Sequence, residues 1–268
     1  MNLRAYVSLF AARFKMLLQY RAAAIAGFGT QLFWGLIRVM ILEAFFRNGA
    51  AAAQPMSLAE TITYVWLGQA FFVMIPYSSN PDPEIRNMMR SGSVAYEMAR
   101  PLDLWGLWYA RAIAARSAPV LLRALPMFAV AVPFFGMALP PSGASALAWA
   151  VAMVGALLLV SAFSTLLTVS LLWTVSGDGI ARLAPSLVLI ASGMIVPIPL
   201  FPDWAQPILA ALPFGGMADA PFRLYMGHLP PEAAPLIVAK QLLWTAAFAL
   251  AGRALLARGV RRLVVQGG

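Results

Sequence analysis

Long runs of apolar residues, separated by short polar segments, make up most of the chain. Most of these runs are close to the roughly 20 residues that an α-helix needs to cross the hydrocarbon core of a membrane. They predict six transmembrane helices, at about 22–46, 58–77, 118–138, 145–174, 181–198 and 236–257. The pattern therefore predicts an all-α, polytopic membrane protein that forms a single domain over 1–268.

Residues 1–20 follow a different pattern, because charged residues interrupt their apolar positions. Leu3, Val7, Phe10 and Phe14 recur at spacings of three and four, which places them on one face of a helix. A basic amphipathic helix of this kind is typical of segments that lie in the membrane interface. The alternative is that 1–20 is the cytoplasmic start of a long first span.

The longest polar segment is 78–116, and apolar residues lie between its charges. It predicts two short helices at roughly 81–90 and 93–99, and a third that runs from 103 into the next span. Pro83 is suited to the start of the first of these helices, and Gly92 to its end. Ser57 and Glu60 likewise predict an N-cap and a first-turn carboxylate for the second span.

Prolines mark two other regions. Pro119, Pro126 and Pro133 recur every seven residues in the third span, which predicts a kinked or locally unwound helix. Segment 199–235 is too rich in proline for one span and too apolar for an ordinary loop. It predicts short re-entrant helices at the outer face, before the last span.

Composition supports the membrane assignment. Of the 268 residues, 62% are hydrophobic and 11% are charged, and the mean hydropathy is +0.79. Soluble globular enzymes and disordered chains are much more polar, so both classes are excluded. The chain has no cysteine and one histidine, which excludes disulfides and multi-histidine metal clusters, and no metal site is predicted.

The basic residues are distributed asymmetrically between the two sides of the predicted membrane. Of 19 Lys and Arg residues, fourteen fall on the side of the termini and of 78–116, two on the other side, and three within spans. Cytoplasmic loops carry such an excess of positive charge. Both termini and 78–116 are therefore predicted to be cytoplasmic, and the net charge of +9 requires no nucleic-acid partner.

Motifs for catalysis are missing from the sequence. It contains no phosphate-binding loop, zinc-binding helix or nucleophile elbow, so the chain is predicted not to be an enzyme. Ion-coupled carriers normally need acidic groups at mid-membrane, and spans two to six have none there. Arg38 lies about eight residues from the outer end of the first span. It either lines a substrate path or anchors an anionic headgroup, or it snorkels to the outer interface or pairs with a neighbouring helix.

Two segments carry a resemblance to a known family. The first is IRNMMRSGSVAYEMARPLD at 85–103, and the second is PIPLFPDW at 197–204, followed by Leu-Pro-Phe at 212–214. Together with the topology, they resemble the permease subunits of type-2 ABC exporters, in the six-span branch that has no fused ATPase. The resemblance implies a multi-pass protein of the bacterial cytoplasmic (inner) membrane that exports its substrate.

The resemblance also implies partners and roles. Two copies of a separate ATPase subunit would carry ATP and Mg, no cofactor would bind this chain, and a second permease, identical or related, would complete the path within membrane lipid. The predicted ATPase contacts are Glu84, Ile85, Arg86, Met89, Arg90, Tyr96, Glu97 and Arg100. The predicted translocation path or outer gate consists of Arg38, Phe201, Trp204, Phe214 and Phe222.

Two alternatives from other classes stay open at this stage. One is an ion-coupled secondary carrier, and the other is a non-transport membrane assembly factor. The chemistry of the cargo is also open, because aromatic and methionine residues suit lipid contact as well as an amphipathic substrate. Co-purification of a soluble ATPase with the chain would separate the exporter from both alternatives.

Overall fold

The protein is described by a computed structural model, which covers residues 3–47, 55–76, 82–173 and 178–260. Within these ranges the chain forms helices and no strand, so the predicted all-α class is confirmed for them. The α-helices are α1 (Leu3–Leu17), α2 (Arg21–Arg47), α3 (Leu58–Phe71), α4 (Pro83–Ser91), α5 (Val94–Met98), α6 (Leu104–Phe134), α7 (Gly143–Ser170), α8 (Asp178–Ala191), α9 (Gln206–Ala211), α10 (Asp219–Tyr225) and α11 (Ala234–Val260). The short 3-10 helices are η2 (Phe72–Met74), η3 (Ile198–Leu200), η4 (Phe214–Met217) and η5 (Pro231–Ala233).

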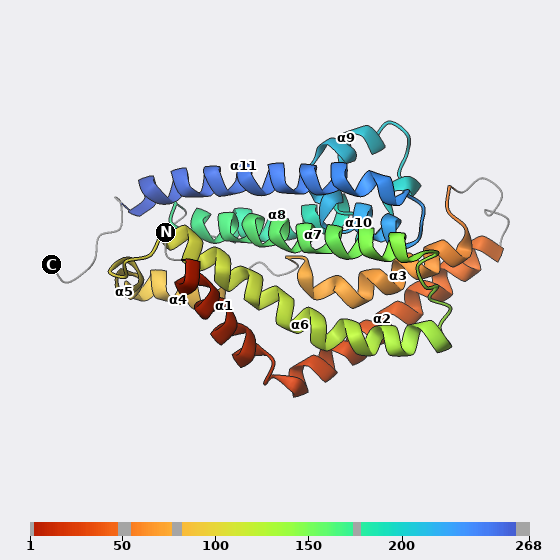
Figure 1. The fold of residues 1–268 in the computed structure, drawn as a ribbon, viewed down its shortest axis with the longest axis horizontal. Coiled ribbons are helices and arrows are strands. Elements are labelled where there is room, and N and C mark those ends of the chain that lie inside the picture. Colours follow the sequence, from red (N-terminus) through yellow and green to blue (C-terminus); the bar gives the residue numbers. More distant parts are fainter. Residues whose placement is uncertain (1–2, 48–54, 77–81, 174–177, 261–268) are drawn as a thin grey trace.

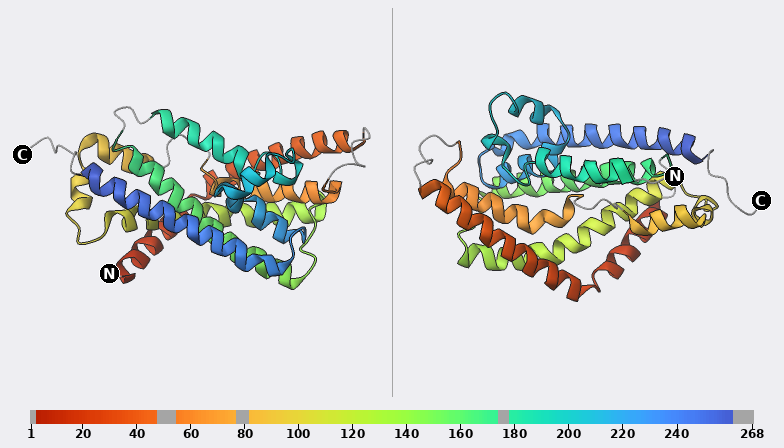
Figure 2. Two further views of the ribbon diagram at one scale, coloured as in Figure 1. Left: turned by 90° about the horizontal axis from the view of Figure 1, so that it is seen from above. Right: turned by 180° about the vertical axis from the view of Figure 1, so that it is seen from behind.

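The long helices run together along one axis of the molecule (Figure 1). Helix α7 packs against α6 and α11, and α6 also packs against α1, α2 and α3. Helices α4 and α5 lie at one end of this bundle, whereas α9 and α10 lie at the other (Figures 1 and 2). The fold therefore separates the polar segment and the proline-rich segment at opposite ends.

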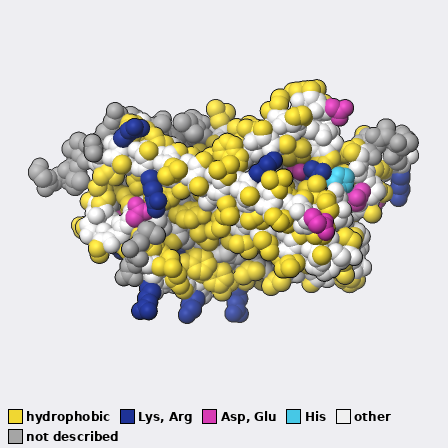
Figure 3. Space-filling model, turned by 45° about the horizontal axis from the view of Figure 1, so that its top comes forward, with side chains coloured by type: hydrophobic (Ala, Val, Ile, Leu, Met, Phe, Trp, Pro, Cys, Tyr) yellow, Lys and Arg dark blue, Asp and Glu magenta, His cyan; other side chains and the backbone are white. Residues whose placement is uncertain are grey.

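Among the described residues, four helices are long and apolar enough to cross a membrane: α2, α6, α7, and α11 together with η5. The apolar helix Leu58–Met74 is shorter, and α8 has 14 residues. Six membrane-spanning helices therefore stay a prediction, in which α3 and α8 would be the two short ones. Hydrophobic side chains cover most of the surface in Figure 3, as contact with lipid requires.

Several predicted boundaries were wrong. The fifth span was expected to reach 198, but α8 ends at Ala191, because Gly193 adopts a left-handed conformation (φ 81°) that breaks the helix. The third span was expected to be kinked or locally unwound; it is not unwound, because one helix of 31 residues continues through all three prolines, and the kink stays a prediction. That helix ends at Phe134, short of 138, because Gly136 is also left-handed (φ 69°).

The predicted helix signals were correct at α3 and α4. Ser57 and Glu60 form a capping box, in which each residue accepts a hydrogen bond from the backbone of the other. Pro83 is the first residue of α4, and Gly92 ends that helix with a φ of 74°. Local sequence signals therefore mark the start of α3 and both ends of α4.

The largest apolar core lies among α3, α6, α7 and α10. Its centre is aromatic: the ring of Phe71 lies 6.1 Å from that of Phe222 and 5.9 Å from that of Trp149, and Tyr225 lies 5.2 Å from Trp149. Phe222 and Tyr225 come from the proline-rich segment. This segment is therefore anchored in the bundle rather than resting on its surface.

Candidate functional site

The polar end of the bundle is organised around α4. The side chain of Asp82 accepts hydrogen bonds from the backbone N–H groups of Glu84 and Ile85, both at 3.1 Å. Ile85 is 1% exposed and packs in a second apolar cluster with Val94 of α5. The Asp82 cap fixes where α4 begins. The buried side chain of Ile85 fixes which face of α4 packs against the rest of the protein.

One arginine of α6 joins three of the acidic residues of this end. The guanidinium of Arg111 lies 3.0 Å from Glu97, 2.9 Å from Glu84 and 3.8 Å from Asp82, measured between nitrogen and oxygen. Its side chain is 9% exposed. The indole N–H of Trp108 donates a 2.7 Å hydrogen bond to the other oxygen of Glu97. A buried cation with several acceptors holds α4 and α5 against α6.

The first helix is tied to the same network. Arg13 of α1 lies 2.6 Å from Glu84. Burial would raise the pKa of Glu84, but the positive charge of Arg111 and the bonds from Arg13 and Arg111 outweigh it, so its pKa lies below the ordinary value. The Glu84 carboxylate is therefore ionised at neutral pH and joins α1 to α4.

A second connection reaches the C-terminal helix. The backbone N–H of Asp103 donates a 3.0 Å hydrogen bond to the hydroxyl of Tyr6 in α1. The carboxylate of Asp103 lies 3.2 Å from Arg253 of α11. Gly252 of α11 lies against the indole of Trp105, where any side chain would collide. We call α1, α4, α5, the first two turns of α6 and the part of α11 that contacts them the cytoplasmic module, after the side of the membrane on which they are predicted to lie.

The eight predicted ATPase contacts differ in how far their side chains are exposed to solvent. Ile85 is in the interior, and Glu97 is 7% exposed and bound to Arg111 and Trp108, so neither presents its side chain at the surface. Tyr96 is 80% exposed. Arg90 and Arg100 are exposed as well, whereas Arg86 and Met89 are half-buried, and Glu84 is shared between Arg13 and Arg111.

Sequence reasoning counted Arg111 as one more cytoplasmic charge and missed its role. An available signal was its position, two turns into an apolar helix whose N-cap is Asp103. At that depth an arginine on the inner face needs carboxylate partners. Four acidic residues precede it in the polar segment, but only the structure shows that three of them converge on it.

The predicted outer residues do not converge on one site. Phe222 is fully buried against Tyr64, with ring centroids 5.3 Å apart, and Phe214 packs on Phe163 at 5.6 Å. Trp204 is 74% exposed, and Phe201 is half-buried. The two inner phenylalanines are part of the core within one chain, and a gating role for the set stays a prediction.

Arg38 lies apart from these aromatic residues. Its guanidinium donates a 3.3 Å hydrogen bond to the backbone carbonyl of Met194, just after α8. It also borders a cavity of about 250 Å³ together with Tyr64 and Leu200. The arginine therefore closes the end of α8 against α2, and its role in a substrate path stays a prediction.

An acidic residue that sequence reasoning did not single out organises the end of the bundle that carries the proline-rich segment, which is predicted to be the outer end. Asp219 is 3% exposed, and its carboxylate accepts hydrogen bonds from the hydroxyl of Tyr64 and from the backbone N–H of Ile198, both at 3.0 Å. Arg223, one turn later, lies 3.5 Å away. Asp219 therefore joins α3, η3 and α10, which are far apart in the sequence.

Comparison with known proteins gives one match. The model of a family described as "ABC-2 family transporter protein" matches residues 56–267, which is most of the chain. No curated protein and no solved structure matches the chain. The matched range includes α4, α5 and Arg111 as well as the whole proline-rich segment.

Proposed function

Because the chain belongs to the ABC-2 transporter family, we propose that it is the permease subunit of an ATP-driven exporter. Membership makes it an integral membrane component of a transport system, in a family that normally works with an ABC ATPase subunit. The match over residues 56–267 is the observation that carries the proposal. The direction of transport, the number of subunits and the contact residues are parts of the proposal.

In this proposal the exposed face of α4 and α5 receives the ATPase. Arg90 of α4, Tyr96 of α5 and Arg100, two residues after α5, are all exposed at one end of the bundle. Exposed arginines and an aromatic ring are suited to an acidic, partly apolar groove on a partner. The cytoplasmic module behind them is fixed to α6 by Arg111, so displacement of α4 moves α6 as well.

The proposed assembly contains two copies of the ATPase, which hold ATP and Mg, and two permeases. It lies in a bacterial inner membrane, with six spans in each permease and both termini in the cytoplasm. The excess of basic residues beside α4 supports this orientation. The absence of native cysteine allows a direct test by single-cysteine labelling: Ser91→Cys is expected to react only from the cytoplasm, and Asp203→Cys only from outside.

The function is tested by purifying the full chain from its native membrane in gentle detergent and identifying the bound proteins by mass spectrometry. We expect an ABC ATPase near one copy per permease chain. In reconstituted vesicles, Arg90→Glu is expected to lower the transport per ATP hydrolysed while the complex remains assembled. Arg47→Glu, at the opposite end of the bundle, is the matched control. Isolation of the chain alone, without ATP hydrolysis, would contradict the proposal.

A further inference from the structure

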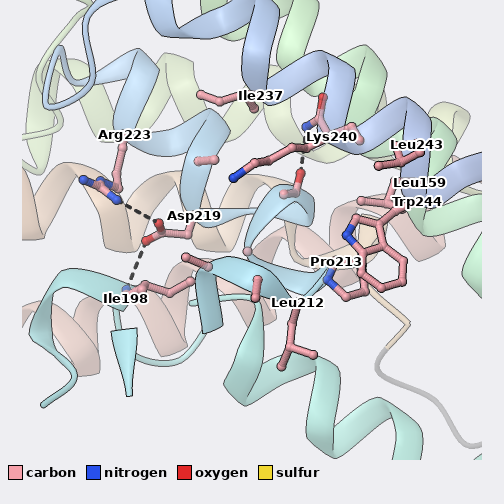
Figure 4. A pocket seen from close by; sticks show the side chains of 16 residues that line it. Leu159, Ile198, Leu212, Pro213, Asp219, Arg223, Ile237, Lys240, Leu243 and Trp244 are labelled. Carbon is pink, nitrogen blue, oxygen red and sulfur yellow. Dashed lines mark hydrogen bonds and ion pairs between the residues drawn. The ribbon is translucent and has the colours of Figure 1, made fainter. Parts of the chain in front are cut away.

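A cavity lies at the end of the bundle predicted to be outer, between α11 and the proline-rich segment (Figure 4). Its volume is about 440 Å³, within the range of small-molecule sites. Leu159, Leu212, Ile237, Leu243 and Trp244 give it mainly apolar walls. Helix α11, which forms one wall of the cavity, is one of the helices long and apolar enough to cross a membrane.

The charged groups of the cavity do not balance one another. Asp219 and Arg223 form an ion pair at 3.5 Å, and Asp219 is further satisfied by two hydrogen-bond donors. Lys240 extends from α11 towards this pair (Figure 4). It makes no hydrogen bond or ion pair with the residues that the structure describes. The cavity therefore has one surplus positive charge beside an apolar surface.

This combination defines the chemistry of a ligand. An ammonium group beside apolar walls in a membrane is stabilised by an anion more than by water, because the interaction strengthens as the local dielectric falls. The same ligand must also place hydrocarbon against Leu243 and Trp244. Trp244 is suited to that boundary, since tryptophan rings favour the level of the lipid headgroups.

We propose that this cavity binds an amphipathic molecule with a phosphate-bearing anionic headgroup. The phosphate lies against Lys240 and is oriented by Arg223, while an acyl chain follows Leu243 and Trp244 along α11. Two sources have this chemistry: a phospholipid that resides in the outer leaflet, or the transported cargo. The inference deepens the proposed function, because the outward orientation of the cavity rests on it.

The test uses the full chain, purified with its bound subunits and placed in nanodiscs of phosphatidylcholine that contain a minor fraction of phosphatidylglycerol. Native mass spectrometry then counts the phosphatidylglycerol retained per chain. We expect one retained molecule in the native protein and in Lys240→Arg, and about tenfold weaker retention in Lys240→Gln, the size of effect expected for one charge-assisted contact. Arg258→Gln, an exposed cation near the other end of α11, is the matched control and should behave as the native protein does.

Two results would overturn the proposal. One is equal retention of phosphatidylglycerol and phosphatidylcholine by the native protein, and the other is unchanged retention in Lys240→Gln. Glycerol 3-phosphate, which lacks the acyl chains, should compete only at much higher concentration. Equal competition by this headgroup would contradict the amphipathic assignment. Retention by Lys240→Arg guards against mistaking a folding defect for lost binding.

A further arm separates the two sources and keeps the test independent of the proposed function. Added ATP and Mg should leave a resident lipid in place but release a transported molecule during turnover. Retention is measured without nucleotide, so it can be read even if no ATPase accompanies the chain. The lack of an ATPase would therefore refute the exporter assignment without affecting the result for the cavity.

Discussion

Replacing Arg111 by Met tests whether the ionic network supports the cytoplasmic module. Methionine keeps an unbranched side chain of similar length but removes the charge that Glu97, Glu84 and Asp82 share. Glu97 is affected most, because its side chain is 8% exposed and keeps only the hydrogen bond from Trp108. A buried carboxylate is then left without its cation.

The magnitude follows from the burial of each partner. Removing one member of a buried ion pair costs about 3–5 kcal/mol. Glu84 is half exposed and retains Arg13, so its share is small, as it is for surface pairs. We therefore expect Arg111→Met to lower the free energy of unfolding by about 3 kcal/mol, nearly all of it through Glu97.

A double-mutant cycle isolates that share. Glu97→Gln is expected to cost about 1–2 kcal/mol, because the amide still accepts from Trp108. The double variant carries no unpaired buried carboxylate, so it should lose at least about 1 kcal/mol less than the sum of the single losses. Unfolding is followed by circular dichroism in mixed micelles with increasing dodecyl sulfate. The reasoning would be refuted if the losses of the two single variants added up to that of the double variant within about 0.5 kcal/mol. It would also be refuted if Arg111→Met alone lost less than about 1 kcal/mol.

Three further predictions follow from individual contacts. Gly252→Ala should destabilise the protein by about 1–3 kcal/mol, because the new methyl group meets an indole ring, whereas Gly29→Ala, with no neighbouring atom within 4 Å, should not; thermal unfolding compares the two. Tyr64→Phe should cost about 1–2 kcal/mol in the same assay, because buried Asp219 loses a donor, and an unchanged midpoint would contradict this. The pKa of Glu84 is lowered in the folded protein, so the contact between Glu84 and α1 should persist at pH 5 and be lost as pH falls through a value below 4.5. Faster hydrogen exchange of α1, corrected for the intrinsic rate, would report the release of that helix. Loss of the contact already above pH 5 would contradict the prediction.

Much of the fold could be predicted from local sequence signals. The ends of α4 follow from Pro83 and Gly92, and the start of α3 follows from Ser57 and Glu60, because caps act over a few residues. The end of α8 could not be predicted in this way. Its apolar run continues past Gly193, and hydrophobicity alone does not reveal a left-handed glycine.

The site residues were harder to predict than the helices. The segment at 85–103 was correctly placed together in one polar region, yet Glu97 and Ile85 turned out to lie inside it. A sequence records charge but not which side of a helix of five residues faces a neighbour. The role of Asp219 was missed for a related reason, since Tyr64 lies 155 residues away from it in the sequence.

One helix joins the two ends of the molecule on which these proposals rest. Near its C-terminus, α11 contacts the cytoplasmic module through Gly252 against Trp105 and through Arg253. Twelve residues earlier, about 18 Å along the axis at 1.5 Å per residue, Lys240 borders the outer cavity. An uninterrupted helix is stiff over that distance, and Gln241 fixes it to α7 by donating to the carbonyl of Ala152 at 3.0 Å. Gln241 therefore ties α11 to α7 beside the cavity, and the same helix reaches the module at Gly252 and Arg253. The cavity wall and the module thus share one continuous helix that is anchored at both places.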